Sequence, residues 1–205
     1  MIVNMSHNLH GREVQMDLNE RLQRVEDRLA IQDLISRYGI TLDDRCYDEV
    51  GELYTEDARF WQHVPAAGTD VRGRREIVEF YRQRLGNVGP SYHYHHGHIV
   101  EFIDARTARG VVTAHAEMGV EGRMVLVGFR YHDLYAKGID DRWRFAERET
   151  WFHYFMPADE LPARYSDEIR RTWPGEPLAA DLPESLPSYQ REPHAPFNRV
   201  SNSGK

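Results

Sequence analysis

The stretch RLAIQDLISRY, residues 28–38, decides the fold expected for this chain, because it continues an apolar periodicity that begins ten residues earlier. Apolar residues recur at intervals of four and three residues, the spacing of one face of an amphipathic helix. The pattern predicts a helix from about residue 18 to about residue 43. Its apolar stripe consists of Leu18, Leu22, Val25 and Leu29 and continues through Ile35 and Tyr38.

The remainder of the chain passes from helical to strand-like patterns. After residue 91, segments rich in aromatic and β-branched residues alternate with Asp- and Gly-rich turns. Helices followed by antiparallel strands indicate an α+β fold, in which a sheet curls around a pocket and helices close the other side. We expect a cone-shaped α+β barrel, with N-terminal helices packed on a curved, mostly antiparallel sheet. The expected elements are helices over 47–53 and 74–85, a strand over 57–64, a turn at 65–68, and strands over 92–103, 108–118, 124–136 and 143–155.

Three segments are expected along the chain: an arm over residues 1–16, one globular domain over residues 17–157 and an extension over residues 158–205. The chain beyond residue 155 holds eight of the ten prolines, which excludes long helices and central strands there. We expect this extension to wrap a surface, for example that of a neighbouring subunit, and to end in a disordered segment over residues 201–205.

Composition limits the possible partners. The 205 residues include 33 acidic and 26 basic side chains, a formal net charge of −7, with no block of Lys or Arg that would follow phosphates. Nucleic acid is therefore not an expected partner. The single cysteine, Cys46, forms no intrachain disulfide, and no apolar run approaches the roughly 20 residues of a membrane-spanning helix. We expect a cytoplasmic protein that does not enter membranes.

Histidines are concentrated in the segment SYHYHHGH, residues 91–98. Histidine titrates near neutrality and suits acid–base chemistry without much tuning. In a regular strand, alternation places His93 and His95 on one face and His96 and His98 on the other, which disfavours a four-histidine metal cage. A two-histidine site completed by Glu101 or His115 stays open. Taken singly, His95, His96 and His98 also fit a polar strand face or a hydrogen-bonded core position.

Two aspartates, Asp43 and Asp44, end the first predicted helix, where the helix dipole favours cations instead. They fit a cap on the next helix, which aspartate forms well. They also fit a functional site, and spacing alone does not pair either of them with a histidine about 50 residues away.

A wider match supports the functional interpretation. The quoted stretch, followed by Leu42-Asp43, resembles the opening helix of the nuclear transport factor 2-like superfamily in its polyketide cyclase-like (SnoaL-like) branch. The match covers residues 20–157 and includes His93-Tyr94, Glu101-Phe102, Gly110, Tyr131, Tyr135, Trp143 and Tyr154-Phe155. Within that branch the pattern is similar to γ-hexachlorocyclohexane dehydrochlorinase and, more distantly, to scytalone dehydratase and bile-acid 7-alpha-dehydratase.

The resemblance implies a lyase that needs no cofactor or metal and acts on a hydrophobic, aromatic small molecule. It assigns Asp43 and His93 to a catalytic pair, Arg148 to a position facing the leaving group and Tyr38 to the pocket. Elimination of water or halide and release of formaldehyde from a hydroxymethyl group fit the same residues. The resemblance also implies a homotrimer or homodimer.

Aromatic and histidine side chains on separate strands are the expected substrate-binding residues. Two other functions stay open: an isomerase like ketosteroid isomerase, which needs a carboxylate base opposite an oxyanion hole, and a non-catalytic binding or assembly module. The histidine at 93 beside an aspartate disfavours the isomerase. The expected substrate-binding residues are Trp61, His63, Tyr94, His95, His115, Trp151 and His153.

Overall fold

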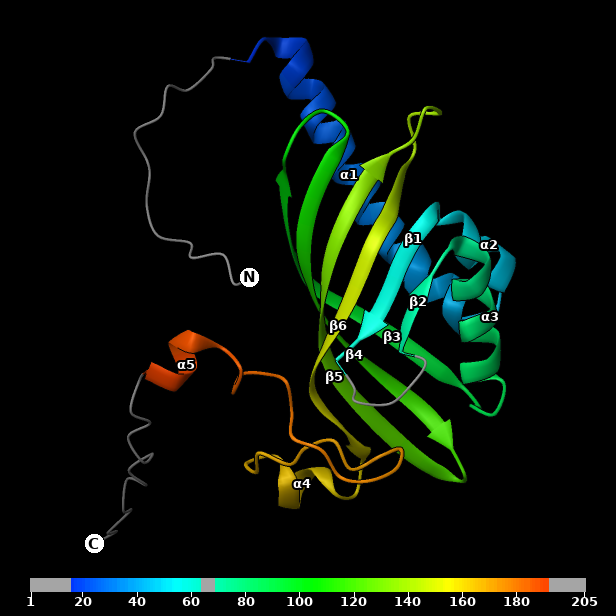
Figure 1. The fold of residues 1–205 in the computed structure, drawn as a ribbon, viewed down its shortest axis with the longest axis vertical. Coiled ribbons are helices and arrows are strands. Elements are labelled where there is room, and N and C mark those ends of the chain that lie inside the picture. The colour runs from blue at the N-terminus through cyan, green and yellow to red at the C-terminus, as the bar shows by residue number, and fades with distance from the viewer. Residues whose placement is uncertain (1–15, 64–68, 192–205) are drawn as a thin grey trace, which may run out of the picture.

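The computed structural model describes residues 16–63 and 69–191 (Figure 1). The predicted turn at 65–68, the predicted disordered segment at 201–205 and all of the predicted N-terminal arm except Met16 lie outside the described residues. The boundaries of the three predicted segments stay predictions. No helix in the described ranges is both long and apolar enough to cross a membrane.

The three N-terminal helices occur where the sequence predicts them. The first begins with a capping box, in which the Asp17 carboxylate accepts from the Glu20 backbone N–H and the Glu20 carboxylate accepts from that of Asp17. This cap and the helical periodicity explain a helix of 26 residues. The helices are α1 (Leu18–Asp43), α2 (Tyr47–Glu52) and α3 (Arg74–Leu85).

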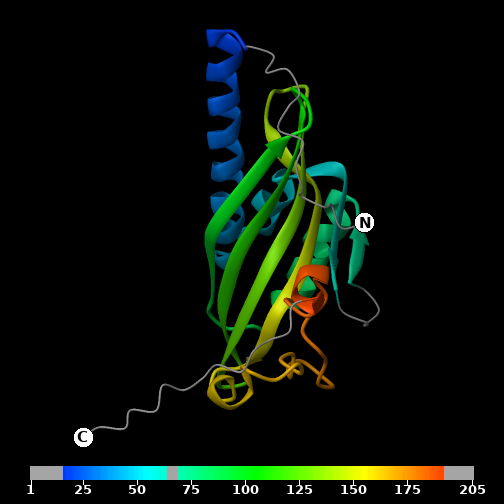
Figure 2. The same cartoon turned by 90° about the vertical axis from the view of Figure 1, so that its left-hand side faces the viewer.

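The buried face of α1 differs from the apolar stripe that predicted the helix. Leu18, Leu22, Val25 and Leu29 are 77%, 55%, 55% and 59% exposed. The first turns of α1 project past the ends of the strand hairpins (Figures 1 and 2). From Arg24 and Asp27 onward the helix contacts the sheet with its opposite face. The prediction of the helix is confirmed. Ile35 and Tyr38 of the stripe are buried, but its first four residues do not belong to the packed face. The residues that α1 buries are Asp27, Ile31, Leu34, Ile35, Tyr38, Gly39 and Leu42.

Six strands form one curved sheet in the order β2-β1-β6-β5-β4-β3. β1 pairs with β6 in parallel, and all other pairs are antiparallel. The edge strands β2 and β3 do not pair with each other, so the sheet is curved but not closed. The short strand β2 was not predicted from the sequence. The strands are β1 (Tyr54–Gln62), β2 (Asp70–Arg72), β3 (Ser91–Phe102), β4 (Thr107–Val120), β5 (Arg123–Lys137) and β6 (Trp143–Pro157).

A bulge in β3 changes the faces expected for the histidines. His95 pairs with Ala114 and His98 with Val112, so β3 has one residue more than β4 over this interval. The extra residue turns His98 to the same face as His93 and His95. The prediction that His98 lies on the opposite face is therefore wrong. His98 instead contacts the buried hydroxyl of Tyr135 at 3.4 Å.

The extension packs against its own sheet. Arg171 forms a parallel bridge with Phe155, at the end of β6, and Ala180 and Leu182 are buried. The guanidinium of Arg170 donates to the carboxylate of Glu184 at 2.8 Å. Two short helices, α4 (Leu161–Arg164) and α5 (Pro187–Arg191), belong to this segment.

Candidate active site

Asp43 and His93 are in direct contact although 50 residues separate them. Asp43 is the last residue of α1, and His93 lies near the start of the edge strand β3. Asp43 Oδ1 is 2.7 Å from His93 Nδ1, and Asp43 Oδ2 accepts from the His93 backbone N–H at 2.8 Å. An aspartate on Nδ1 fixes the tautomer with the proton on that atom. His93 Nε2 is then the free basic nitrogen.

A second set of hydrogen bonds holds the end of α1 against β3. Ser91 Oγ donates to Asp43 Oδ1 at 3.3 Å, and Arg45 donates to Ser91 Oγ and to the Gly89 carbonyl at 2.8 Å each. The alternative role of Asp43 as a cap is not seen. Cys46 occupies the N-cap position of α2 without a cap hydrogen bond from its side chain, and both carboxylate oxygens of Asp43 bind β3.

His93 lies in the wall of a cavity of about 420 Å³ between α1, α3 and the inner face of the sheet. Small-molecule sites commonly measure about 300–1,000 Å³. Most of the lining is aromatic or aliphatic, with few polar groups. The lining residues are Tyr38, Leu42, Phe60, Gln62, Phe80, Tyr81, Arg84, Leu85, Asn87, Val88, His93, Ala116, Met118, Val120, Glu121, Val127, Phe129, Tyr131, Thr150, Phe152, Phe155, Trp173 and Pro174.

Three tyrosine hydroxyls are joined at the buried side of this cavity. The Tyr81 hydroxyl oxygen is 2.8 Å from that of Tyr38 and 3.2 Å from that of Tyr54. Burial raises the pKa of Tyr81 and of Tyr54 well above the ordinary value of tyrosine. Both hydroxyls therefore keep their protons at neutral pH. Because Tyr38 and Tyr81 line the cavity, the chain places phenolic donors near a ligand.

Arg148 lies behind the cavity wall. It is fully buried and donates two hydrogen bonds of 2.8 Å to the carboxylate of Asp133. Its guanidinium carbon is 4.2 Å from the ring centre of Tyr38 and 3.9 Å from that of Tyr131. Burial opposes its charge, but Asp133 holds the pKa of Arg148 well above its ordinary value. Arg148 contacts two residues of the cavity wall but is not itself a lining residue.

The expected substrate-binding residues do not line this cavity. Trp61 and His63 both bond to the carboxylate of Glu149, beside a hollow that the extension borders. The Trp151 ring contacts that of His63, with ring centres 4.0 Å apart and an angle of 36° between the ring planes. His153 is the extra residue of a β6 bulge, since Tyr154 pairs with Gly128 and Phe152 with Phe129.

Tyr94, His95 and His115 also lie apart from the cavity. His115 stacks on Tyr94 with ring centres 4.7 Å apart, and its Nδ1 is 2.7 Å from His96 Nε2. His95 points to the inner face, 6.1 Å from the rings of Tyr38 and Tyr131. Burial lowers the pKa of His95 to about 3, so its ring is neutral.

The metal alternative finds no support in the described part of the chain. Glu101 is bound to Arg109, with hydrogen bonds of 2.9 and 2.7 Å. Within residues 16–63 and 69–191, no group of three or more His, Cys, Asp or Glu side chains is arranged to hold a metal ion.

Sequence reasoning missed most of the apolar wall. Phe129 and Tyr131 are inward residues of β5, and strand alternation was the signal for them. Trp173 and Pro174 come from the extension, where no pattern in the sequence marks them as pocket residues. The Trp173 ring lies 5.3 Å from that of Phe155.

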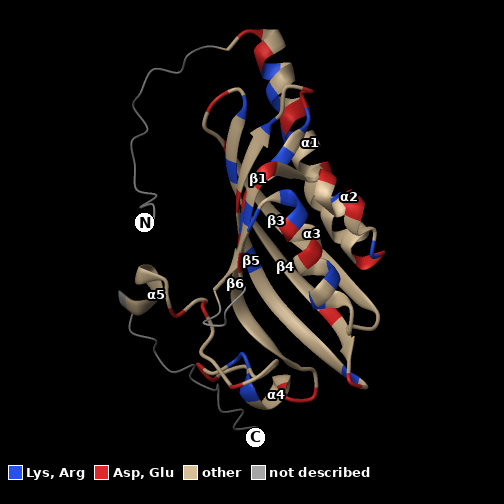
Figure 3. Cartoon of the chain, turned by 45° about the vertical axis from the view of Figure 1, so that its right-hand side comes forward, with Lys and Arg blue, Asp and Glu red and all other residues tan. Residues whose placement is uncertain are grey.

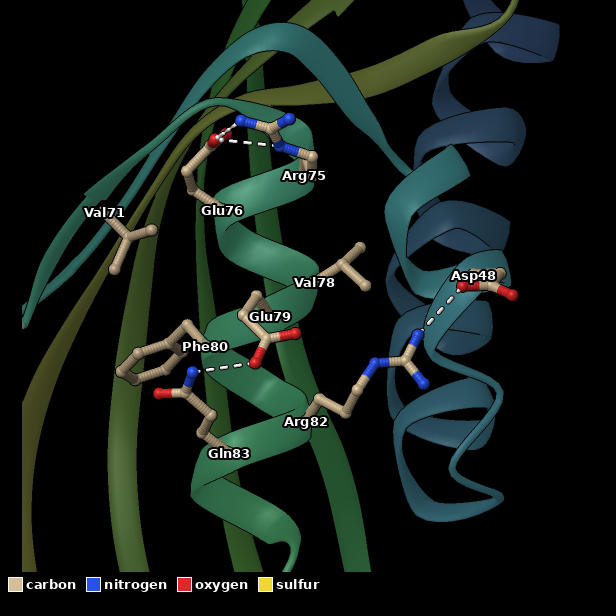
Figure 4. A pocket seen from close by; sticks show the side chains of 9 residues that line it. All are labelled: Asp48, Val71, Arg75, Glu76, Val78, Glu79, Phe80, Arg82 and Gln83. Atoms are coloured by element: carbon tan, nitrogen blue, oxygen red, sulfur yellow. Dashed lines mark hydrogen bonds and ion pairs between the residues drawn. The ribbon is translucent and has the colours of Figure 1, made fainter.

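A larger, more open hollow of about 610 Å³ lies along α3 (Figure 4). Its polar side chains bind one another: Arg75 with Glu76, Gln83 with Glu79, and Arg82 with Asp48. The pairs leave few polar groups free for a ligand, and neither Asp43 nor His93 borders this hollow. The cavity at His93 is therefore the candidate active site.

Helices that close a cavity on a curved, open sheet define an α+β fold of the nuclear transport factor 2-like superfamily. Residues 23–149 match the model of the SnoaL-like domain, and the chain belongs to that family. The resemblance seen in the sequence is thereby confirmed. The match ends before Phe152, Phe155, Trp173 and Pro174, so part of the cavity wall lies beyond the family domain.

Similar proteins include solved structures named for a dehydrochlorinase and a dehydratase, and uncharacterized proteins. The hexachlorocyclohexane dehydrochlorinase LinA-type3 from Novosphingobium barchaimii is 21% identical, with a TM-score of 0.61, covering 67% of this chain and 93% of that one. A candidate scytalone dehydratase from Novosphingobium aromaticivorans is 17% identical, with a TM-score of 0.60, covering 66% and 90%. The uncharacterized protein Rv2910c of Mycobacterium tuberculosis is 29% identical over 127 residues, 60% of this chain and 84% of that protein.

Proposed function

We propose that this protein is a cofactor-independent lyase that acts on a hydrophobic, aromatic small molecule by His–Asp acid–base catalysis. The observation that carries the proposal is the 2.7 Å contact between Asp43 and His93 at the wall of a largely apolar cavity. The names dehydrochlorinase and dehydratase, given to structural neighbours, denote eliminations and support the reaction class.

His93 acts as the base in this proposal. Its Nε2 removes a proton from the substrate, the electron pair of the broken C–H bond forms a double bond, and the bond to the leaving group breaks. Halide leaves as the anion, whereas a leaving hydroxyl takes back the proton from the imidazolium and departs as water. Asp43 stabilises the imidazolium that forms and holds the ring in place. The side chain of His93 is 10% exposed and that of Asp43 is 15% exposed. Because both are mostly buried, their electrostatic interaction is stronger than it would be in water.

Release of formaldehyde would use the same groups. His93 takes the proton of a hydroxymethyl group, the C–C bond breaks as the aldehyde forms, and the electron pair passes to the remaining aromatic part of the substrate. The product therefore distinguishes the two reactions, although the base is the same.

Charge that develops on the leaving group needs a donor, and the joined hydroxyls of Tyr38 and Tyr81 supply one at the cavity wall. Arg148 acts as a positioning residue in this scheme, because its cation lies against the rings of Tyr38 and Tyr131 and is bound to Asp133. Its contribution is to orient these rings and to place positive charge behind them.

Two variants test the proposal against a panel of hydroxylated, halogenated and hydroxymethyl-bearing aromatic compounds. We expect His93→Ala and Asp43→Asn to fold, as checked by circular dichroism, and to lower kcat by about 10²–10⁴-fold. His115→Ala is the matched control, because this histidine lies outside the cavity and should leave turnover unchanged.

The products decide among the functions. Release of water, halide or formaldehyde by the wild type without added cofactor supports the lyase. A product with the formula of its substrate would indicate an isomerase. Binding without turnover, equal in wild type and variants, would contradict catalysis and indicate a binding module.

A further inference from the structure

The apolar stripe on the N-terminal half of α1 is not used by the fold or by the candidate active site. Leu18, Leu22, Val25 and Leu29 are each more than half exposed, although large apolar side chains gathered on one surface usually mark an interaction site. Within the chain, the inward face of this half is formed by Asp27, which accepts from Trp143 at 2.8 Å and pairs with Lys137 at 2.9 Å.

The stripe points away from the body of the protein. Successive residues of an α-helix are rotated by about 100°, so the four stripe residues fall within about 60° of one another, roughly opposite Asp27 and Ile31. Asp27 and Ile31 are buried against the sheet side. Nothing in the described part of the chain covers the stripe, and the fold leaves it open to another molecule.

The spacing of the stripe is that of a two-stranded coiled coil. Intervals of four, three and four residues place Leu22 and Leu29 at a positions and Leu18 and Val25 at d positions of a heptad. The stripe spans only about two heptads, which would be marginal for isolated peptides. Here the helix is already formed and anchored by its C-terminal half, so association does not have to nucleate it.

The charged residues beside the stripe favour pairing with α1 of a second copy in parallel orientation. In this register Arg21 and Arg28 occupy g positions, and Glu26 and Asp33 occupy e positions. A parallel pair brings each g residue near the e residue five positions later in the partner, which matches arginine with carboxylate in both heptads. An antiparallel pair would bring arginine to arginine and carboxylate to carboxylate.

These charges are available for pairing. Within the described residues, no ion pair or side-chain hydrogen bond engages Arg21, Glu26 or Asp33. Arg28 forms no ion pair there; it makes a long contact of 3.4 Å to the Val100 carbonyl, and its guanidinium lies 5.7 Å from the ring centre of Phe102. Figure 3 shows acidic and basic residues distributed along this part of α1. The arrangement is self-complementary, as a two-fold symmetric contact requires.

We propose that α1 docks on α1 of a second copy of this chain, as a parallel two-helix pair along Leu18, Leu22, Val25 and Leu29. This surface lies outside the cavity at His93, so the pairing goes beyond the proposed function and does not depend on it. The pair buries the stripe of each copy and leaves both cavities outside the contact.

Light scattering of the full chain tests the pair. We expect the Leu22→Glu/Leu29→Glu variant to fold like wild type, because both side chains are exposed, and its molar mass to fall to about half. Ile139→Glu is the matched control, because Ile139 is also exposed but lies in the β5–β6 turn. A molar mass that is equal in wild type and the double variant overturns the proposal.

Crosslinking tests the orientation. In a Cys46→Ser background, Val25→Cys should form a covalent dimer on mild oxidation, because equivalent d positions meet only in a parallel pair in register. Ile139→Cys should stay monomeric on reducing-agent-free gels. Failure of Val25→Cys to crosslink contradicts the parallel pair.

Charge reversal provides an independent check on the pairing. Arg21→Glu should weaken association by placing Glu beside the partner's Glu26, and Arg21→Glu/Glu26→Arg should restore it. Strengthening by Arg21→Glu alone would indicate antiparallel helices and would also overturn the proposal.

Discussion

Arg148 and Asp133 show how a single buried pair supports the site. Neither side chain is exposed to solvent, and the two are joined by two hydrogen bonds. Removing one partner of such a pair leaves an uncompensated buried charge, which costs much more than the pair itself contributes. The rings of Tyr38 and Tyr131 rest on this guanidinium, so the pair also fixes part of the cavity wall.

We predict that Asp133→Asn lowers the free energy of unfolding by about 3–5 kcal/mol, measured by urea denaturation. Asp70→Asn is the matched control, because Asp70 forms the same two 2.8 Å bonds with Arg59 but its side chain is 50% exposed. An exposed pair contributes about 0–1 kcal/mol. Similar losses in the two variants would show that burial of the Arg148 pair has no special effect.

At the scale of elements, irregularities in strands and the extension determine the cavity. The β3 bulge re-aims His98 toward Tyr135, and the β6 bulge places His153 as an unpaired residue. The extension contributes Trp173 and Pro174 to the wall. The bulges change how two histidines are oriented or paired, and the extension adds two residues to the cavity wall.

We predict that Trp173→Ala raises KM about tenfold while kcat changes little. The cavity loses part of its apolar wall, whereas the Asp43–His93 pair is unchanged. A tenfold change in KM corresponds to about 1.4 kcal/mol. Trp61→Ala serves as the control, since Trp61 does not line this cavity. Steady-state kinetics on the substrate identified for the wild type measure both constants. A fall in kcat at unchanged KM would mean that Trp173 acts in the chemical step instead.

At the scale of the whole molecule, buried neutral histidines link folding to pH. Burial, with Arg148 as a smaller contribution, lowers the pKa of His95 to about 3, and burial with Arg130 lowers that of His153 to about 4. An unfolded chain binds protons on these rings below pH 6.5, and the native state does not. Stability is therefore full above pH 6.5 and decreases as the pH falls toward 3.

We predict that His95 alone makes the protein about 2 kcal/mol less stable at pH 5 than at pH 8. The His95→Gln variant should lose this part of the pH dependence, whatever its stability at pH 8. Urea denaturation of both proteins at the two pH values measures the difference. Equal pH dependence in wild type and variant would show that His95 titrates normally in the folded state.

The sequence by itself determined the order of the elements and the reaction class to test. Helical and strand periodicities depend on neighbouring residues, so α1 and α3 were predicted nearly to the residue. The family resemblance singled out Asp43 and His93, which the structure brings into contact. Association into a homotrimer or homodimer stays a prediction.

Only the tertiary structure decided which side chains share the cavity and which face of α1 is packed. One extra residue in a strand reverses the faces that follow it, and no local pattern announces such an insertion. The residues Leu18 to Leu29 of the stripe are apolar, but they are exposed because they lie on the face of α1 opposite Asp27 and Ile31, which pack against the sheet. Trp173 reaches the cavity through the path of the extension. These outcomes depend on contacts between distant parts of the chain, which periodicity does not encode.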